Sequence, residues 1–567
     1  MHKKMMKLTF WLTALLTLFF YCKPAHAVDA GNNVPQPPKQ PVLLVYDSKN
    51  AAEHDENNID SLQRLFVSLN LPIKTMSMAQ YQPGTLKDQN YSAVVLMVNW
   101  PEAHLIKNSF VKDLENFHGK ILHVGPSLTA VEKQQLQGNI QYLRHKQYFL
   151  YDKSNKYYQM LDFINSSEFV TKPAAGSQVI GQLTSQDYQD KMSHKFIPYG
   201  VIHNNIAFLP YFRADGLSFL EASELIAQFF GRQTQTYRPL LVITGITPYS
   251  DLRRLVKVAE YLYSEGIPYA ISATSVATNT NLKAYHYYTL ALQHVENNGG
   301  EIFLQVPSIY APDTAKTAYT TLRNDMTQTL TALRDNYVYP IGISAPAYWN
   351  QDELYRSAAL SLSNQILLTS DPDENPLPYA QEDNYGETYG RTYYAMTASS
   401  LNTIKEGNDL DSQDDLRFST PTAVTMPLPT SSKSFLQFKR NIKTVNLQWA
   451  NPDYGDFKSC VQAGNKQISF LHGNYLVDNN LMEVPLTAAK IAADGKAQVP
   501  HGTLSGFFNV QGIILEVFII IALIILVVLF VLGYRVYVGM FKYTNKRHKT
   551  TLGTLRKLSK KKRKEHK

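Results

Sequence analysis

The sequence predicts an α/β protein with a doubly wound first domain, a β/α barrel, a small β-rich segment and one C-terminal transmembrane helix. Three observations predict this arrangement. Continuous apolar runs alternate with segments of helical periodicity along most of the chain, a pattern typical of buried parallel strands and the helices that cover them. A short, positively charged and then apolar segment begins the chain. A long apolar run followed by basic residues lies near its end.

Residues 1–27 have the three parts of a secretory signal peptide. Lysines precede an apolar run, and Ala25-His26-Ala27 supplies the small-x-small pattern, so we expect cleavage after Ala27. Lipidation of Cys22 is the alternative, and the bulky Tyr21 directly before it disfavours that reading. Removal of the peptide leaves Cys460 as the only cysteine. The exported part is therefore expected to depend on apolar cores rather than on an intramolecular disulfide.

Residues 513–532 predict a single transmembrane helix. Twenty residues at 1.5 Å each match a hydrocarbon core of about 30 Å, and a surface helix would not be apolar on every face. Glu516 is the only charged residue in this run. A carboxylate inside a membrane is costly, so we expect Glu516 to contact another membrane subunit, unless it simply reaches water at the nearby interface.

Residues 533–567 form a basic tail, with thirteen lysines and arginines against one acidic residue. Basic residues beside a span remain in the cytoplasm. We therefore expect a single-pass protein of the cell membrane with an extracytoplasmic body and a cytoplasmic tail. The net charge of +8 comes from the tail and the signal peptide, and the remaining part has more acidic than basic residues. This balance argues against a nucleic-acid partner.

Residues 28–41 form a proline-rich linker, and the first domain is expected over residues 42–232. Its apolar runs, interrupted by helical segments near 59–69 and 109–117, are 42–46, 73–76, 93–98, 121–124 and 206–210. This alternation indicates a doubly wound sheet, whose ligands bind at the carboxyl ends of the strands. No glycine-rich phosphate loop follows any of these strands. The domain resembles flavodoxin-like and amidotransferase-like units, without the nucleophilic cysteine of the latter.

Residues 238–425 repeat the order of strand and then helix, which predicts a β/α barrel. The expected strands are 240–243, 267–271, 301–304, 341–345 and 366–369, and the expected helices are 250–264, 286–296 and 315–335. Short alternating runs between residues 430 and 509 predict a β-rich segment that leads to the membrane span.

The barrel block resembles a polysaccharide-deacetylase-related family, and within it the YdaL-like membrane proteins of bacterial exopolysaccharide operons. The resemblance is carried by Arg238-Pro-Leu-Leu-Val-Ile, Tyr261-Leu-Tyr-Ser-Glu-Gly266, Gly299-Gly-Glu-Ile and Ile343-Ser-Ala-Pro346-Ala-Tyr348. It implies a deacetylase-like barrel, a polysaccharide ligand and a place beside a processive glycosyltransferase or another exopolysaccharide-synthesis subunit.

The chain departs from this family where the resemblance implies a metal centre. The matching positions are Thr244 and Gly245 after the first barrel strand, and Gln305 and Ile309 after the Gly-Gly-Glu-Ile strand. A divalent metal needs imidazole, thiolate or carboxylate ligands. We therefore expect no metal, no cofactor and no deacetylase catalysis at these positions.

Aromatic residues are the candidate binding groups. Tyr385, Tyr389 and Tyr393 lie in a polar stretch, and Tyr348-Trp349 follows a predicted strand. Exposed aromatic rings suit the flat C–H faces of sugars, although these rings could instead pack against the barrel. Asp251 is a further candidate, with helix capping as the alternative.

These observations favour a non-catalytic, membrane-anchored component of bacterial exopolysaccharide synthesis or export, whose barrel binds glycan or partner proteins. Two alternatives remain open. One is a carbohydrate esterase, a polysaccharide N-deacetylase with a non-standard site. The other is an extracytoplasmic ligand-binding receptor.

Overall fold

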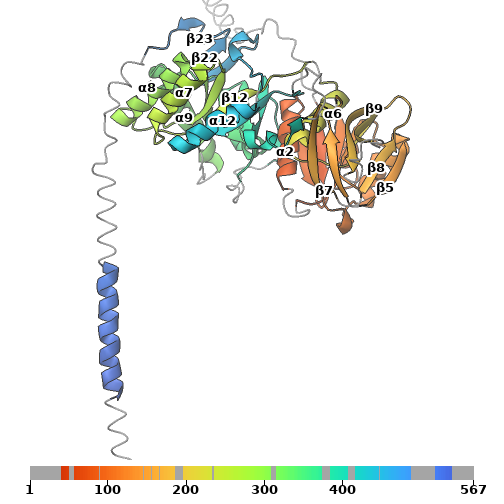
Figure 1. Ribbon diagram of the computed structural model, residues 1–567, viewed down its shortest axis with the longest axis horizontal. Helices are drawn as coiled ribbons and strands as arrows, with labels where there is room; N and C mark the ends of the chain where they lie inside the picture. The colour runs from red at the N-terminus through yellow and green to blue at the C-terminus, as the bar shows by residue number, and fades with distance from the viewer. Residues whose placement is uncertain are drawn as a thin grey trace, which may run out of the picture. The chain divides into compact units, whose positions relative to one another are not determined.

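The computed structural model (Figure 1) describes residues 40–49, 56–88, 90–144, 146–154, 156–164, 167–185, 196–232, 235–307, 315–372, 383–406, 416–445, 447–486 and 518–538. The chain divides into two units between Ala488 and Ala489, and each is considered by itself. The predicted signal peptide, the basic tail beyond residue 538, Ile309 and Glu516 lie outside the described residues.

The first domain has a parallel core of five strands. These are β1 (Val42–Tyr46), β2 (Ile73–Ser77), β3 (Ala93–Met97), β4 (Lys120–Val124) and β11 (Ile206–Leu209). Their order in the sheet is β2-β1-β3-β4-β11, the order of flavodoxin-like folds. Alternate residues of β1 enter different cores, because Val42 and Leu44 pack with Leu62 of one helix, whereas Leu43 and Val45 pack with Phe110 of another. The predicted doubly wound domain is confirmed.

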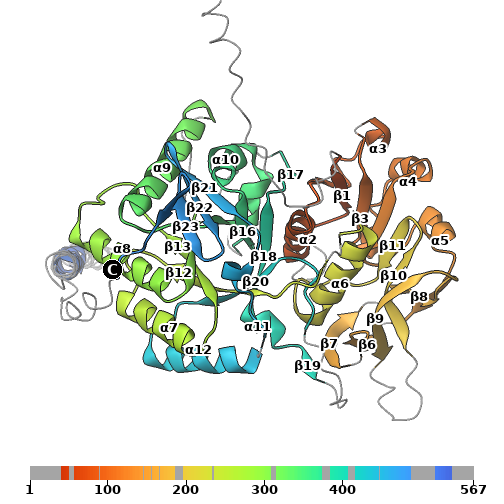
Figure 2. The same cartoon turned by 90° about the horizontal axis from the view of Figure 1, so that it is seen from above.

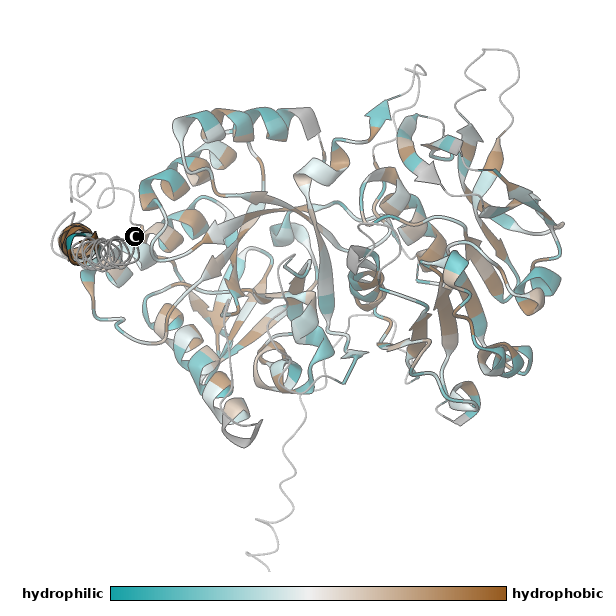
Figure 3. Cartoon of the chain, turned by 90° about the horizontal axis from the view of Figure 1, so that it is seen from below, coloured by the Kyte–Doolittle hydropathy of each residue, from teal (hydrophilic) through white to brown (hydrophobic). Residues whose placement is uncertain are grey.

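Helices cover both faces of this sheet. On one face lie α2 (Glu56–Ser68) and α6 (Gly216–Phe229), and on the other lie α4 (Asn108–Glu115) and α5 (Ala130–Leu136); α3 (Thr85–Asp88) packs against α4. Figure 3 shows that the strands are largely hydrophobic, whereas the outer helices carry both hydrophobic and hydrophilic residues.

An antiparallel extension follows the parallel core. The strands β10 (Ile197–His203), β9 (Gln178–Ser185), β6 (Lys146–Tyr151) and β7 (Tyr157–Ile164) continue the sheet beyond β11. A separate antiparallel pair consists of β5 (Asn139–Leu143) and β8 (Ser167–Lys172). None of these strands is predicted from the sequence, because their polar, irregular pattern has no clear period.

Both edges of the first sheet are closed by segments from the barrel part of the chain. The short strand β17 (Tyr385–Gly386) pairs with β2, and β19 (Lys405–Glu406) pairs with β7. The resulting sheet has eleven strands. Figure 2 shows β17 and β19 reaching from the barrel side toward the first domain.

The barrel closes with seven parallel strands. These are β12 (Leu240–Ile246), β13 (Tyr269–Thr274), β14 (Gly300–Gln305), β15 (Gly342–Pro346), β16 (Gln365–Thr369), β18 (Arg391–Thr397) and β20 (Thr422–Pro427). Closure results from the parallel pairing of β12 with β20. The predicted β/α barrel is thus confirmed.

Helices surround the barrel in the predicted alternation. They are α7 (Leu252–Ser264), α8 (Lys283–Asn297), α9 (Ala315–Asp335), α10 (Glu353–Ala358), α11 (Ala398–Leu401) and α12 (Ser432–Val445). The helix α12 corrects one prediction, because residues 430–509 were expected to be β-rich throughout. Phe438 and Ile442 are buried, so helical spacing of apolar residues makes this stretch a barrel helix.

A four-stranded antiparallel meander closes the amino end of the barrel. It consists of β21 (Ser459–Ala463), β22 (Lys466–Leu471), β23 (Asn474–Val477) and β24 (Asn480–Met482). Tyr475 packs against Tyr339, which precedes β15, with ring centroids 5.4 Å apart. Cys460 N–H donates to the Asn364 side chain, which precedes β16, over 2.7 Å. Among the described residues, the meander therefore packs at the end of the barrel opposite to the carboxyl ends of its strands.

The second unit contains the helix Phe518–Val538, which is long and apolar enough to cross a membrane, with a mean hydropathy of 2.9. The helix continues beyond the predicted end at Leu532, and residues 513–517 lie outside the described part of the chain.

Candidate functional site

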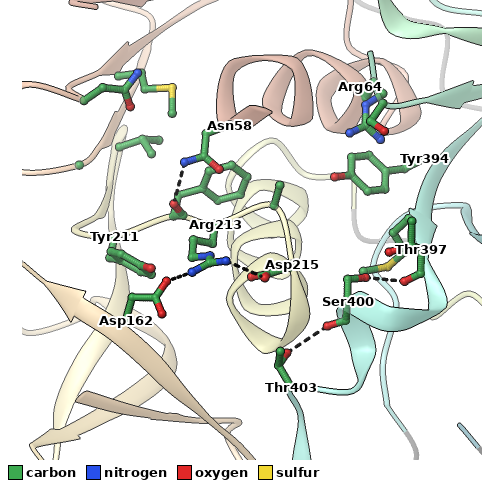
Figure 4. Close-up of a pocket in the computed structure, with 18 of the residues that line it drawn as sticks. Asn58, Arg64, Asp162, Tyr211, Arg213, Asp215, Tyr394, Thr397, Ser400 and Thr403 are labelled. Carbon is green, nitrogen blue, oxygen red and sulfur yellow. Dashed lines mark hydrogen bonds and ion pairs between the residues drawn. The ribbon is translucent and has the colours of Figure 1, made fainter. Parts of the chain in front are cut away.

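A cleft of about 790 Å³ lies between the first domain and the barrel (Figure 4). Its first wall comes from the carboxyl ends of β3, β4 and β11, and its second from the carboxyl ends of β16, β18 and β20. Ligands bind at the carboxyl ends of strands both in open α/β sheets and in β/α barrels. The two halves of the body thus present their usual ligand-binding edges to one shared cleft.

Asp47 shapes the loop after β3. Its carboxylate accepts hydrogen bonds from the backbone N–H groups of Asn99 and Trp100 over 2.7 and 2.8 Å. Burial raises the pKa of Asp47, and these backbone donors oppose that rise. Asp47 therefore fixes the loop that carries Asn99 into the cleft wall.

Gly125 gives the wall its shape at the end of β4. Its φ is +102°, and an added Cβ would lie 2.2 Å from the carbonyl oxygen of Val98. Its N–H donates to Leu209 O over 2.8 Å. The loops after β3, β4 and β11 meet here so closely that only glycine fits.

Arg213 lies on the first-domain wall between two carboxylates (Figure 4). It pairs with Asp215 over 3.0 Å and also with Asp162 of β7. Asp215 occupies the N-cap position of α6 but does not cap it. Gln159 does so instead, since its Oε1 accepts from the N–H groups of Leu217 and Ser218. Asp215 is thereby left to pair with Arg213.

Hydroxyl groups line the barrel wall. Thr397 and Ser399 form a hydrogen bond over 2.8 Å. Ser400 of α11 and Thr403, which follows α11, also line this wall. Hydroxyls both donate and accept hydrogen bonds, so this wall is suited to polar, uncharged groups.

Arg64 joins the two walls from the polar face of α2. It pairs with Asp60 over 2.9 Å and donates to Ala395 O of β18 over 2.7 Å. Its guanidinium lies 4.2 Å from the ring centroid of Tyr394, and Ser61 Oγ is 2.7 Å from the Tyr394 hydroxyl. The polar face of α2 is therefore buried against the barrel.

Asp371, which follows β16, stands close to this cluster. Its carboxylate accepts from Tyr348 N–H over 2.8 Å. Burial and the negative charge of Asp60 raise the pKa of Asp371 to about 7, and burial also raises the pKa of Asp60. The Arg64 guanidinium, which pairs with Asp60, opposes this rise in the pKa of Asp371 through its positive charge.

The shifted pKa of Asp371 predicts a pH dependence of stability. A carboxyl whose pKa is higher in the folded state binds its proton more tightly there. Its stabilising contribution is complete below its usual pKa and is lost as pH rises toward about 7. We expect Asp371→Asn to gain stability over the unchanged chain between pH 4 and 8, by at most about 4 kcal/mol.

Urea unfolding of the full chain in detergent at several pH values measures this gain. Ser264→Ala, at an exposed position without a titratable group, is the control, and its stability difference from the unchanged chain is expected to be constant with pH. A difference for Asp371→Asn that is also constant with pH would contradict the expected titration.

Of the positions matched to the family's metal centre, the described ones, Thr244, Gly245 and Gln305, lie outside the cleft lining. Thr244 and Gly245 sit at an irregularity in the pairing of β12 with β13, and Gly245 has a φ of +76°. Gln305 Oε1 accepts hydrogen bonds from Ser272 and Ser344 over 2.8 and 2.7 Å. Among the described residues, no group of three His, Cys, Asp or Glu side chains comes within reach of one metal ion.

Most of the predicted aromatic platforms are not on the surface. Tyr348, Trp349 and Tyr393 are 2 %, 1 % and 6 % exposed, so the expectation that they are exposed sugar platforms is wrong. Trp349 stacks on Tyr355 at 4.5 Å, and the rings fill space between the barrel and its short helices. The apolar area of these rings stabilises the core more than it could stabilise a ligand.

The remaining candidates have structural partners. The half-buried Tyr389 donates to Asn350 over 3.1 Å, and Tyr385 forms part of the edge strand β17 with its ring 5.6 Å from the Arg356 guanidinium. Asp251 is the N-cap residue of α7 and accepts from Arg254 N–H over 3.2 Å. None of the three lines the cleft.

Comparisons with known proteins give distant likenesses. The sequence matches no protein-family model and no curated protein. Among solved structures, the carbohydrate deacetylase Agd3 is 8% identical, with a TM-score of 0.27, over 69% of this chain and 79% of Agd3. A catalytic mutant of Gan42B, a GH42 β-galactosidase from G. stearothermophilus, is 8% identical, with a TM-score of 0.23, over 34% of this chain and 30% of that protein. Likenesses of this degree carry no argument about function.

Proposed function

We propose that this chain is a membrane-anchored, non-catalytic component of bacterial exopolysaccharide synthesis or export, and that its body holds a glycan in the cleft between the first domain and the barrel. The observation that carries the proposal is the cleft itself. It is formed at the ligand-binding edges of two sheets, and its volume of about 790 Å³ lies in the range of small-molecule and oligosaccharide sites.

The lining matches the chemistry of a sugar. Hydroxyls of Thr397, Ser399, Ser400 and Thr403 and amides of Asn58 and Asn99 reach the cleft. Sugar hydroxyls pair well with such groups, because each hydroxyl both donates and accepts. Tyr211 adds an aromatic ring, against which the C–H face of a sugar can stack.

A non-catalytic role is supported by the residues at the family's metal positions. Thr244, Gly245 and Gln305 offer no imidazole or carboxylate, and Gln305 already accepts two hydroxyl hydrogen bonds. One observation favours the alternative of a carbohydrate esterase. Asp371 has a pKa near 7 beside the cleft, as a general acid or base requires. Release of acetate from acetylated oligosaccharides, abolished by Asp371→Asn, would establish this alternative.

The membrane part of the proposal is supported by the helix Phe518–Val538. With the basic tail in the cytoplasm, the body lies outside and faces the exported polymer. Glu516, next to this helix in the sequence, would contact a second membrane subunit. A processive glycosyltransferase is the partner that this arrangement suits.

Blocking the cleft is expected to abolish glycan binding. Ser399 is exposed on α11, so Ser399→Trp places an indole in the cleft without disturbing a core. We expect at least about a tenfold loss of affinity, because a filled pocket excludes its ligand. The measurement is retention of labelled hexasaccharides by right-side-out membrane vesicles that contain the full chain.

The matched control is Ser264→Trp, which changes an exposed serine at the end of α7, near the amino ends of the barrel strands. It is expected to bind as the unchanged chain does. Binding that survives Ser399→Trp would contradict the cleft as the site, and binding seen only after the vesicles are opened would contradict the orientation.

A further inference from the structure

We infer that the cleft selects an uncharged stretch of polysaccharide, and that Arg213, held between Asp162 and Asp215, sets this preference. The inference rests on the proposed function and adds to it the charge class of the glycan and the residues that determine it.

The charges in the cleft compensate one another. Among the described residues of the lining, the charged ones are Arg64, Arg213, Asp162 and Asp215, and no lysine, glutamate or histidine is present. Arg213 pairs with both Asp162 and Asp215, and Arg64 pairs with Asp60, which lies outside the lining. A ligand that enters this lining therefore meets ion pairs and hydrogen-bonding groups rather than a free cation.

Neither guanidinium is free to neutralise an anionic sugar. The Arg64 side chain is buried, pairs with Asp60 and lies over the Tyr394 ring. Breaking these contacts to bind a ligand would cost free energy. The side chain of Arg213 is 40 % exposed and is engaged on both flanks, by Asp162 and Asp215. A guanidinium carries five N–H donors, so Arg213 can still donate to a sugar hydroxyl while its charge stays compensated.

Asp215 offers the complementary acceptor. Its Oδ2 pairs with Arg213, whereas its Oδ1 is buried and finds no hydrogen-bond donor among the described residues. Asp215 Oδ1 lacks a donor because Gln159, rather than Asp215, accepts hydrogen bonds from the first N–H groups of α6. A buried acceptor without a donor is costly, and a sugar O–H that donates to Oδ1 removes that cost.

The energetic consequence is discrimination by desolvation. A uronate entering the cleft loses water from its carboxylate and gains no unpaired cation. An ammonium sugar loses water from its cation and meets carboxylates whose charge already pairs with Arg213. Burying an uncompensated charge costs far more than burying hydroxyls that remain hydrogen-bonded. An uncharged sugar is therefore favoured over both charged classes.

Three hexasaccharides of equal length test the inference: cellohexaose, which is uncharged, a hexamer of galacturonic acid, and a hexamer of glucosamine. For the full chain in detergent at low salt, we expect cellohexaose to bind at least tenfold more tightly than either charged hexamer. Arg213→Gln leaves two carboxylates without their cation. We expect its affinity for the glucosamine hexamer to be at least tenfold higher than that of the unchanged chain. Asp162→Asn leaves Arg213 with one carboxylate partner. We expect its affinity for the galacturonate hexamer to be several-fold higher than that of the unchanged chain. Both gains should shrink as salt is added.

The controls separate this inference from the proposed function. Asp162 is 66 % exposed, so Asp162→Asn is expected to fold even if Arg213→Gln does not. Arg253→Gln, at an exposed position on α7, should leave all three affinities unchanged. Absence of binding by every hexamer would overturn the proposed function, whereas equal or tighter binding of a charged hexamer by the unchanged chain would overturn only the charge preference.

Discussion

Arg64→Met is expected to lower the free energy of unfolding by about 3–5 kcal/mol, the range observed when one partner of a buried ion pair is removed. Arg64 pairs with Asp60, acts on Asp371 through its charge, and donates to Ala395 O of β18. Methionine fills similar volume but leaves two buried carboxyl groups without compensation. Because Arg64 joins α2 to the barrel, the variant should also lose the shape of the cleft and therefore its glycan affinity.

Urea unfolding of the full chain in detergent, followed by tryptophan fluorescence, measures this loss. Arg253→Met changes an exposed arginine and is expected to stay within about 0.5 kcal/mol of the unchanged chain. The double variant Asp60→Leu with Arg64→Met should recover part of the loss, since apolar replacement of both partners removes the uncompensated charge. A single variant as stable as the unchanged chain would show that this cluster does not hold the two halves together.

Gly125→Ala is expected to lower the free energy of unfolding by about 2–5 kcal/mol. A left-handed conformation costs an L-residue about 1–2 kcal/mol, and overpacking adds about 1–3 kcal/mol. The added methyl would lie 2.2 Å from the carbonyl oxygen of Val98, so the backbone of β3 or β4 must move. Since this backbone forms a wall of the cleft, glycan binding should weaken together with stability.

Gly266→Ala provides the matched control. Gly266 follows α7 with a φ of +66°, and nothing lies within 4 Å of an added Cβ. Its cost should be confined to the backbone strain, about 1–2 kcal/mol, and glycan affinity should not change. Equal losses for the two glycines, measured by the same unfolding assay, would contradict the close approach of the loops at Gly125.

Much of the fold could be predicted from sequence, because buried parallel strands are continuously apolar. The runs at 42–46 and 240–243 became β1 and β12 for this reason. Strands of the antiparallel extension were missed, since runs such as Tyr157–Ile164 mix polar and apolar residues on both faces. The helix Ser432–Val445 was missed because its helical spacing was outweighed by the strand patterns that follow it.

The site was harder to predict, because its residues come together only after the two halves pack. The helix near 59–69 reads as amphipathic, so its polar face is expected to meet water. That face holds Asp60 and Arg64, which are instead buried against β18. Two signals were present in the sequence. The i, i+4 spacing of this pair suits an ion pair, and Arg213-Ala-Asp215 follows a predicted strand at its ligand-binding end.

The crowded tyrosines were misread for a related reason. Composition gives the same count of aromatic rings whether they stack on a sugar or fill a core, and only the tertiary contacts of Tyr348 and Trp349 distinguish these cases. Arg64 and Tyr394 face each other across the boundary between the halves, and their sequence separation hides the pair from any local pattern.

The strand β17, which completes the sheet at β2, has a consequence for how the protein is made. Lys74 on β2 bonds to the backbone at Asp383, 309 positions later in the chain. An emerging first domain therefore exposes the N–H and C=O groups of both sheet edges until the barrel part of the chain has been made. Unpaired edges of this kind recruit other chains, and contacts between distant residues form slowly. The nascent body should thus depend on a holding chaperone, and truncation before residue 383 should yield aggregates rather than an independent domain.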